Sequence, residues 1–318
     1  MIIARVIRDE GLSSAMRRTR ERVAERIQDA RYFSSSDAPI VNIAPGGTGS
    51  RTGGIAVQLR ARLREERLHR PIMLAGRASG AKAIHFEGAG SVVQTPYIVA
   101  IHDVTLLHER ELLHSAASLV FASEFLRDQY QLAGVVIEPG LSVAPAILPA
   151  NGRGIAFAGA VQRHKGGHLL PDIARALAKR GETLYVFGRG DGDLLRALRA
   201  MKNVKLYGYY EGGTLPSLLT KHRIGLVLVP SIVPEAFCLT ISEAWAAGAA
   251  VAAFDLGAQA ARIRRYGGGW LAPLESGAEG IVRIIDRWSP IAVPSDIPTA
   301  KTSAAAYLDL YRRLAWLG

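Results

Sequence analysis

Two carboxylates stand eight positions apart in an otherwise apolar stretch, PEAFCLTISEAWAAG, at residues 234–248. They are Glu235 and Glu243, between the aliphatic runs IGLVLV and AAVAAF. A helix that begins near Leu239 or Thr240 would leave the amides of its first turn without partners in the helix. Because the helix dipole supports these amides, the sequence predicts an anion-binding site at the start of the helix.

Two interpretations of this pair are open. In the first, Glu235 lies just before the helix and Glu243 lies one turn inside it, about 5 Å along the axis. The acids then bracket a phosphate, and each carboxylate can accept hydrogen bonds from sugar or ribose hydroxyls. In the second, Glu235 caps the helix and Glu243 faces solvent. The spacing alone favours neither.

Basic and glycine-rich loops offer further groups for a phosphate. The segment AGAVQRHKGG, residues 158–167, supplies Arg163, His164 and Lys165. The charges and donors of the arginine and the lysine suit a diphosphate. Glycine-rich turns are expected between a strand and a helix at 45–56 and 186–193, where a backbone can approach a ligand closely. The alternatives are an ordinary basic loop and flexible glycine loops without a ligand.

Short apolar runs alternate with helical patterns along 38–141, and the alternation restarts at 154. This arrangement predicts α/β structure with parallel sheets covered by helices, in two doubly wound domains that face a cleft. The Pro- and Gly-rich segment at 144–154 is the expected linker. Ligands of such sheets bind beyond the carboxyl ends of the strands, where the loops described above must lie.

Composition excludes several classes of protein. The chain has 318 residues and a single cysteine, Cys238, so an internal disulfide is excluded and a reducing compartment is expected. No apolar run approaches the length of about 20 residues that crosses a bilayer. The net charge of +11 divides into +3 for residues 1–150 and +8 for residues 151–318. Aromatic residues make up only 7%, without basic stacking platforms, so nucleic acid is not an expected partner.

The first 37 residues are expected to form an N-terminal extension, 1–37, with a basic amphipathic helix over 10–31. Its arginines could rest on an anionic membrane. Alternatively, the helix packs on the body of the protein and its basic face is solvated.

A family resemblance lies in five segments within residues 154–273: GAVQRHKGG, LYVFGRGDGDLLRAL, NVKLYGYYEGGTLPSLL, VPSIVPEAFCLTISEAWAAGAAVAAFDLGA and GGGWLAP. In order and spacing they resemble the nucleotide-binding domain of GT-B-fold glycosyltransferases, in particular the retaining family 4. The resemblance implies two Rossmann-like domains facing a cleft. These would be an acceptor-side domain at 38–145 and a nucleotide-sugar-binding domain at 146–300, with a helix at 301–318 that returns to the first domain.

The resemblance extends to about 38–141, where TGGIAVQLRARL contains Gly54 and YIVAIHDV contains His102. It also implies roles for individual residues. Glu235 would contact the transferred sugar, Glu243 would bind the ribose, Lys165 would bind phosphate, and His102 would lie near the reacting carbon. The residues implied to lie close to the donor are Gly54, Gly159, Gly188, Phe237, Cys238, Leu239 and Thr240.

Two departures from the family pattern are visible. The family usually has Gly-Arg where this chain has Gly159 and Ala160, and Arg163 is the expected replacement for that arginine. The first domain is short, which indicates trimmed helices on the acceptor side.

The implied activity is a retaining hexosyl transfer from a nucleotide-diphosphate sugar, with electrostatic stabilisation of the leaving diphosphate. No cofactor and no metal are expected. The implied acceptor is a saccharide or a lipid-linked saccharide, in polysaccharide or glycoconjugate synthesis. The expected location is the cytoplasm, with peripheral contact to the inner membrane face. The alternatives are a non-catalytic nucleotide-sugar-binding subunit and a sugar-nucleotide epimerase of the same fold, for which Glu87 is the only tempting acid.

Overall fold

The computed structural model describes residues 40–43, 72–74, 83–88, 90, 92–141, 152–211 and 213–316. Three sequence-based predictions fall outside these ranges, wholly or in large part. They are the basic helix at 10–31, the glycine loop at 45–56 with Gly54, and most of the linker at 144–154.

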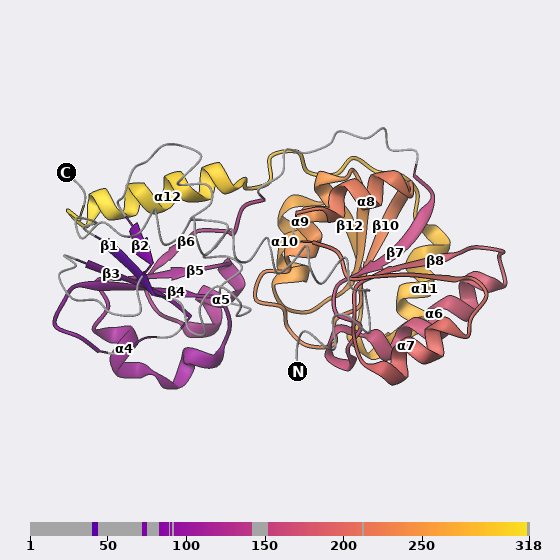
Figure 1. Cartoon of the computed structure of the whole chain (residues 1–318), viewed down its shortest axis with the longest axis horizontal. Coiled ribbons are helices and arrows are strands. Elements are labelled where there is room, and N and C mark those ends of the chain that lie inside the picture. The colour runs from indigo at the N-terminus through magenta and orange to yellow at the C-terminus, as the bar shows by residue number, and fades with distance from the viewer. Residues whose placement is uncertain are drawn as a thin grey trace, which may run out of the picture. The chain divides into compact units, whose positions relative to one another are not determined.

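A first parallel sheet is built from the amino-terminal part of the chain (Figure 1). Its strands are β1 (Ile40–Ile43), β2 (Ile72–Leu74), β3 (Ala83–Glu87), β4 (Tyr97–Ile101), β5 (Ser118–Phe121) and β6 (Val135–Val136). Their order is β2-β1-β3-β4-β5-β6, and β1 runs parallel to β2 and β3, as β5 does to β6. Every residue of β3 and β4 is buried, which is typical of parallel strands covered on both faces. The connections include η2 (Thr105–His108), α4 (Arg110–His114) and α5 (Glu124–Tyr130).

The last helix, α12 (Ala300–Arg313), contributes Tyr311 to the interior next to β3. The Tyr311 hydroxyl lies 2.7 Å from Nδ1 of His85, and Nε2 of His85 lies 3.5 Å from Oε1 of Glu87. All three side chains are buried. Glu87, the acid that an epimerase would need, is therefore committed to an interior cluster.

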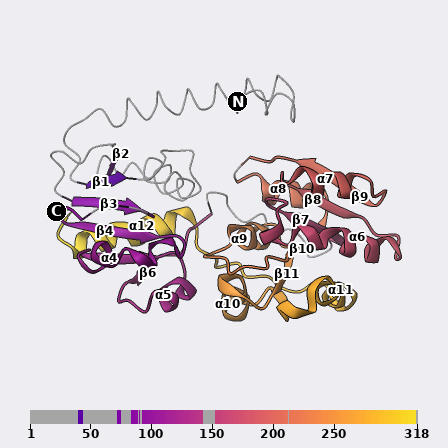
Figure 2. The same ribbon diagram turned by 90° about the horizontal axis from the view of Figure 1, so that it is seen from below.

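A second parallel sheet follows (Figure 2). Its strands are β7 (Gly154–Ala158), β8 (Leu184–Phe187), β9 (Val204–Gly208), β10 (Ile224–Val229), β11 (Ala250–Phe254) and β12 (Gly269–Ala272). Their order is β12-β11-β10-β7-β8-β9, and each adjacent pair is parallel. With β7 counted as the first strand, this is the 3-2-1-4-5-6 order of the dinucleotide-binding fold. The order reverses between β7 and β10, so this is the switch point at which such sheets bind ligands.

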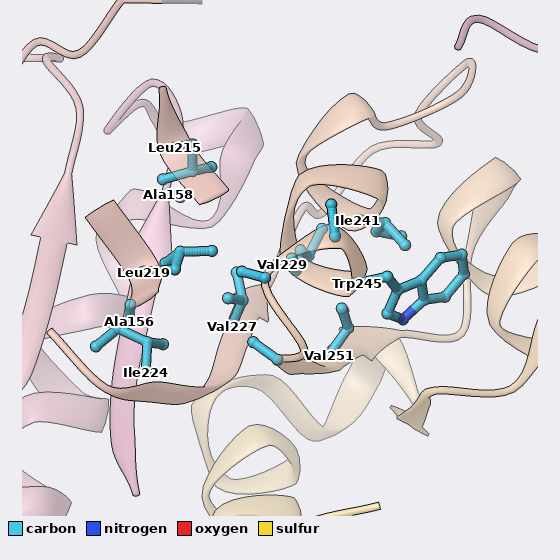
Figure 3. Close-up of a cluster of buried hydrophobic side chains, with 14 of the residues drawn as sticks. Ala156, Ala158, Leu215, Leu219, Ile224, Val227, Val229, Ile241, Trp245 and Val251 are labelled. Atoms are coloured by element: carbon cyan, nitrogen blue, oxygen red, sulfur yellow. The ribbon is translucent and has the colours of Figure 1, made fainter. Parts of the chain in front are cut away.

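Six helices cover the second sheet: α6 (Leu170–Ala178), α7 (Gly192–Arg199), α8 (Leu215–Lys221), α9 (Leu239–Ala246), α10 (Gly257–Tyr266) and α11 (Gly277–Arg287). Alternate strand residues join two separate hydrophobic clusters, as the period-two geometry of strands requires. Ala156 and Val227 pack with α8, α9 and α10, whereas Ile155 and Leu226 pack with α6, α7 and α11. Figure 3 shows the first cluster, with Ile241 and Trp245 of α9 against the strands.

The predicted α/β class with two parallel sheets is confirmed. Packing divides the described part of the chain into two compact units, one from within residues 40–99, 111–118 and 308–316, the other from within residues 100–110 and 119–307. The domain limits expected from the sequence stay predictions. None of the helices in the described ranges combines the length and the apolar character that crossing a bilayer requires.

Candidate functional site

Two loops leave the switch point of the second sheet side by side. One follows β7 and contains η3 (Arg163–Lys165), and the other follows β10 and leads into α9. The loops are bonded to each other, because the carbonyl of His164 accepts hydrogen bonds from the Ile232 amide at 3.0 Å and the Ser231 hydroxyl at 3.1 Å. The sheet order therefore brings together two segments that are about seventy positions apart in the chain.

Gly166 allows the close approach of these loops. Its φ is +75°, and a Cβ atom there would lie 1.9 Å from the carbonyl oxygen of Pro230. Any other residue would meet both a left-handed backbone and a clash with the neighbouring loop. The glycine thus fixes where Lys165, its neighbour, enters the site.

The glycine turn after β8 is packed against the loop after β7. A Cβ atom on Gly188 would lie 1.8 Å from the carbonyl oxygen of Gly159. The Val161 amide donates to the Arg189 carbonyl at 2.7 Å, and the Asp191 amide donates to the Val161 carbonyl at 2.9 Å. The turn therefore belongs to the same group of carboxyl-end loops, as the sequence indicated.

Lys165 and Glu235 form a bidentate ion pair across the two loops. The Lys165 Nζ atom lies 2.5 Å from Oε1 and 2.6 Å from Oε2 of Glu235. The lysine side chain is 34% exposed and the glutamate side chain 12%. The pair therefore remains within reach of a ligand that approaches from solvent.

The helix α9 begins at Leu239, as predicted. Its N-cap is Cys238, with a left-handed φ of +67°, and no side chain caps this end of the helix. The alternative in which Glu235 caps the helix is therefore wrong. The amides of Phe237, Cys238, Leu239 and Thr240, called the anion seat below, precede the first turn or lie in it, where intrahelical partners are missing.

Glu243 is buried, with 9% of its surface exposed, so the solvated alternative for this residue is also wrong. Burial raises the pKa of its carboxyl from 4.5 to about 7, and a hydrogen bond from the backbone of Gly213 acts in the opposite direction. Burial and the Glu243 charge both raise the pKa of Tyr210. The carboxylate therefore faces the loop between β9 and α8. A further hydrogen-bond donor would stabilise its charged form.

The sequence did not reveal two polar residues of α10 that hold the loop before α9. Gln259 is fully buried, and its Oε1 accepts a hydrogen bond from the Glu235 amide at 3.0 Å. Arg262 is 3% exposed and donates to the carbonyls of Phe237 and Cys238 at 3.3 and 3.1 Å. The available signal was their three-residue spacing on a helix otherwise rich in alanine.

The remaining predicted residues lie as follows. Arg163 is exposed in η3, beside Lys165 in the chain. Ala160 is half-buried in the same loop and offers no cation. His102 is half-buried and directly follows β4 of the first sheet, so its role at the reacting carbon stays a prediction. Within the ranges described, no group of three or more His, Cys, Asp or Glu side chains is placed to hold a metal ion.

The described site combines free helix amides, one lysine and two carboxylates in different surroundings. Backbone amides and a lysine suit an anion. A buried carboxylate suits a ligand hydroxyl, because the hydroxyl can donate the hydrogen bonds that water would donate to an exposed carboxylate. The arrangement thus fits a ligand that carries both phosphate groups and hydroxyls.

Residues 152–288, less than half of the chain, match the family model described as glycosyl transferases group 1. The matched region contains the whole of the second sheet and the site described above. No curated protein matches the chain.

Several solved structures share the fold. The Anabaena protein Alr3699/HepE, in complex with UDP and glucose, is 17% identical with a TM-score of 0.61, covering 87% of this chain and 98% of its own. A glycosyltransferase from Rickettsia africae is 14% identical with a TM-score of 0.66, covering 88% and 99%. Sucrose-phosphate synthase from Thermosynechococcus elongatus is 18% identical with a TM-score of 0.59, covering 83% and 80%. At these identities the likeness establishes the fold, which is the GT-B arrangement of two parallel α/β sheets expected from the sequence.

Proposed function

We propose that this protein is a retaining glycosyltransferase of the family 4 type that transfers a hexosyl group from a nucleotide-diphosphate sugar. One observation carries the proposal: Lys165, Glu235 and the anion seat meet at the switch point between β7 and β10. This is where a sheet of this order binds nucleotides. The family match over residues 152–288 supports the same conclusion.

The donor is assigned to the site by its chemistry. The diphosphate occupies the anion seat next to Lys165, with Arg163 as a second cation and the turns at Gly159 and Gly188 close to it. The transferred sugar lies at Glu235. The ribose hydroxyls donate hydrogen bonds to Glu243, whose carboxylate is buried and therefore gains most from such donors.

Transfer breaks the bond between the anomeric carbon of the sugar and the diphosphate oxygen, and forms a bond from that carbon to an acceptor oxygen on the same face. The proton of the acceptor hydroxyl passes to the leaving phosphate. Negative charge grows on the diphosphate as the bond breaks, so amides and a lysine already in place stabilise the transition state more than the ground state. Neither a metal nor another cofactor takes part in this proposal, and His102 supports the reacting sugar.

The ion pair between Lys165 and Glu235 describes the ligand-free state. A phosphate competes with Glu235 for Lys165, and sugar hydroxyls compete with Lys165 for Glu235. A complete donor satisfies both partners at once, whereas a nucleoside diphosphate satisfies only the lysine. The site is thereby suited to distinguish the donor from the product.

The acceptor is proposed to be a saccharide or a lipid-linked saccharide of polysaccharide or glycoconjugate synthesis. The proposed location is the cytoplasm, with peripheral contact to the inner membrane face. The basic residues of 10–31, which support the membrane contact, lie outside the described ranges. These assignments rest on the family resemblance.

A panel of nucleotide-diphosphate sugars, assayed by the release of nucleoside diphosphate, tests the proposal. We expect one donor to be turned over slowly without an acceptor and faster with added saccharide. Glu235→Gln serves as the matched control, and we expect it to release no nucleotide above background. Release at equal rates from wild type and this variant would refute the assignment.

A non-catalytic nucleotide-sugar-binding subunit is the second candidate. Ala160 favours it, because the loop after β7 lacks the arginine that family members usually carry there. Binding of a donor without any turnover, across all donors and acceptors, would select this function. The epimerase alternative loses its support, since Glu87 is buried against His85. An epimerised product that keeps its nucleotide would reinstate it.

A further inference from the structure

A buried arginine lies directly behind the anion seat. Arg262 of α10 donates from Nη1 to the carbonyls of Phe237 and Cys238, and from Nη2 to the Ser242 hydroxyl at 2.7 Å. Its guanidinium also lies over the ring of Phe237, 3.9 Å from the centroid. A second ring, that of Trp245, lies 5.3 Å from the guanidinium. The side chain is therefore fixed by three hydrogen bonds and two ring contacts, all to residues 237–245.

The two bonded carbonyls determine where the neighbouring amides point. In a trans peptide the carbonyl and the N–H of one plane point in opposite directions. The Phe237 carbonyl shares its plane with the Cys238 amide, and the Cys238 carbonyl shares its plane with the Leu239 amide. Because both carbonyls are turned inward to Arg262, both amides are turned away from it, toward the side where an anion would lie.

Cys238 needs this support. A non-glycine residue at a φ of +67° is strained by about 1–2 kcal/mol, so the loop would relax to another conformation without a partner that holds it. The hydrogen bonds of Arg262 to the carbonyls on both sides of this residue supply that partner. The strain is thus located at the residue that separates the two outward amides.

The same helix also holds the other end of the loop. Gln259, one turn before Arg262, accepts from the Glu235 amide at 3.0 Å, and its Nε2 lies 3.5 Å from the Val233 carbonyl. A Cβ atom on Gly257 would lie 2.7 Å from the Glu235 nitrogen. One face of α10 therefore positions both Glu235 and the amides that follow it.

Arg262 also brings a charge. Burial lowers the pKa of the Arg262 guanidinium from its usual value, and the carboxylate of Glu138 acts in the opposite direction. A guanidinium nevertheless stays protonated in proteins. A positive charge behind a helix N-terminus acts in the same direction as the helix dipole. Because water is excluded from this position, the charge is screened less than a surface lysine would be.

We propose that Arg262 is a positioning residue for the diphosphate: it never touches the ligand, but it turns the Cys238 and Leu239 amides outward and adds positive charge behind them. The inference rests on the proposed function in one respect, namely that the anion is the diphosphate of a nucleotide donor.

Calorimetric titration of the full-length protein with a panel of nucleoside diphosphates, and with the matching nucleosides, tests this inference. In Arg262→Met we expect the affinity for the diphosphate to fall about 10-fold. The affinity for the nucleoside, which has no phosphate, is expected to change less than about 2-fold. A merely structural role would weaken both ligands together, or neither.

Arg264→Met is the matched control. Arg264 lies on the same helix, but its side chain is exposed and pairs with Asp255 at the surface. The Arg264→Met substitution removes the same charge from the protein without disturbing the anion seat. We therefore expect the diphosphate affinity to stay within about 2-fold of wild type. Equal losses in the two variants would overturn the inference, because net charge alone would then explain them.

Arg262→Lys completes the test if Arg262→Met does not fold. Lysine keeps the charge but not the forked donors, so we expect about 3-fold weaker diphosphate binding, between wild type and Arg262→Met. The inference is overturned if a folded Arg262→Met protein binds the diphosphate as strongly as wild type. If only Arg262→Lys folds, the same result in that variant overturns it. If wild type binds no nucleoside diphosphate at all, the proposed function fails instead.

Discussion

The Lys165 ammonium and the Glu235 carboxylate form a two-pronged ion pair, with Nζ–O distances of 2.5 and 2.6 Å, across the switch point of the second sheet. Each partner is assigned to a different part of the donor. In the free protein they satisfy each other, so a ligand must replace an existing interaction rather than fill an open one.

Glu235→Gln separates binding from transfer. The substitution removes the charge that competes with phosphate for Lys165, so nucleoside diphosphate affinity is expected to equal or exceed that of wild type. Donor turnover should fall by about 100-fold or more, because the sugar loses its carboxylate partner. Calorimetry and nucleotide release on the same preparation measure both quantities. Parallel losses of affinity and turnover would contradict the separate roles.

Glu243 makes stability depend on pH. Burial raises its pKa from 4.5 to about 7, so between these values the folded state holds a proton that the unfolded state has lost. Stability therefore falls as pH rises from 4.5 to 7, by about 3 kcal/mol in total. We expect Glu243→Gln to melt at a higher temperature than wild type at pH 8 and at a similar temperature at pH 4.

The matched control for this pH effect is Glu279→Gln, which changes a carboxylate that is 90% exposed on α11. Its melting temperature should follow that of wild type at both pH values. Glu243→Ala should also weaken nucleotide binding, because the ribose loses its acceptor. If Glu243→Gln and wild type show the same pH dependence of melting, Glu243 is not buried as described.

Gly166 is expected to tolerate no side chain. Gly166→Ala combines a left-handed φ with a contact of 1.9 Å to the Pro230 carbonyl, so we expect a loss of at least about 3 kcal/mol in the free energy of unfolding. Gly181 has a similar φ of +69°, but a Cβ there meets nothing within 4 Å. Gly181→Ala should therefore cost only about 1 kcal/mol. Equal costs in urea unfolding would show that the loops do not approach as described.

Cys238 is expected to be an unreactive thiol. A helix N-terminus usually lowers a cysteine pKa. Here burial outweighs that effect and, with the Glu235 charge, raises the pKa to about 12. Because the chain has one cysteine, an aromatic disulfide reagent at pH 8 reports on this thiol alone. We expect slow modification of the native protein and fast modification in urea; fast native modification would contradict the raised pKa.

Local features of the site could be predicted from the sequence. The aliphatic run before residue 230 and the helical pattern after it depend on neighbouring residues only. The start of α9 at Leu239 was therefore predicted correctly. Parallel sheets could be predicted for the same reason, since alternating buried strands and helices leave few other arrangements.

Long-range features could not be predicted in this way. The pairing of Lys165 with Glu235 depends on β7 and β10 being neighbours, which is a property of the whole sheet. The burial of Glu243 depends on the loop between β9 and α8, and the spacing of the two acids left a solvated residue equally open. Arg262 was missed because its partners, the Phe237 and Cys238 carbonyls and the Ser242 hydroxyl, lie on another element 20 or more positions away in the chain.

Calorimetric titration of wild type and Lys165→Met with a panel of nucleoside diphosphates tests the central claim most directly. The claim is that the loops at the switch point hold a nucleotide diphosphate. We predict that at least one nucleoside diphosphate binds wild type, and that Lys165→Met binds it at least about 10-fold more weakly while remaining folded. Absence of binding to wild type, or equal binding by a folded Lys165→Met protein, would contradict the account.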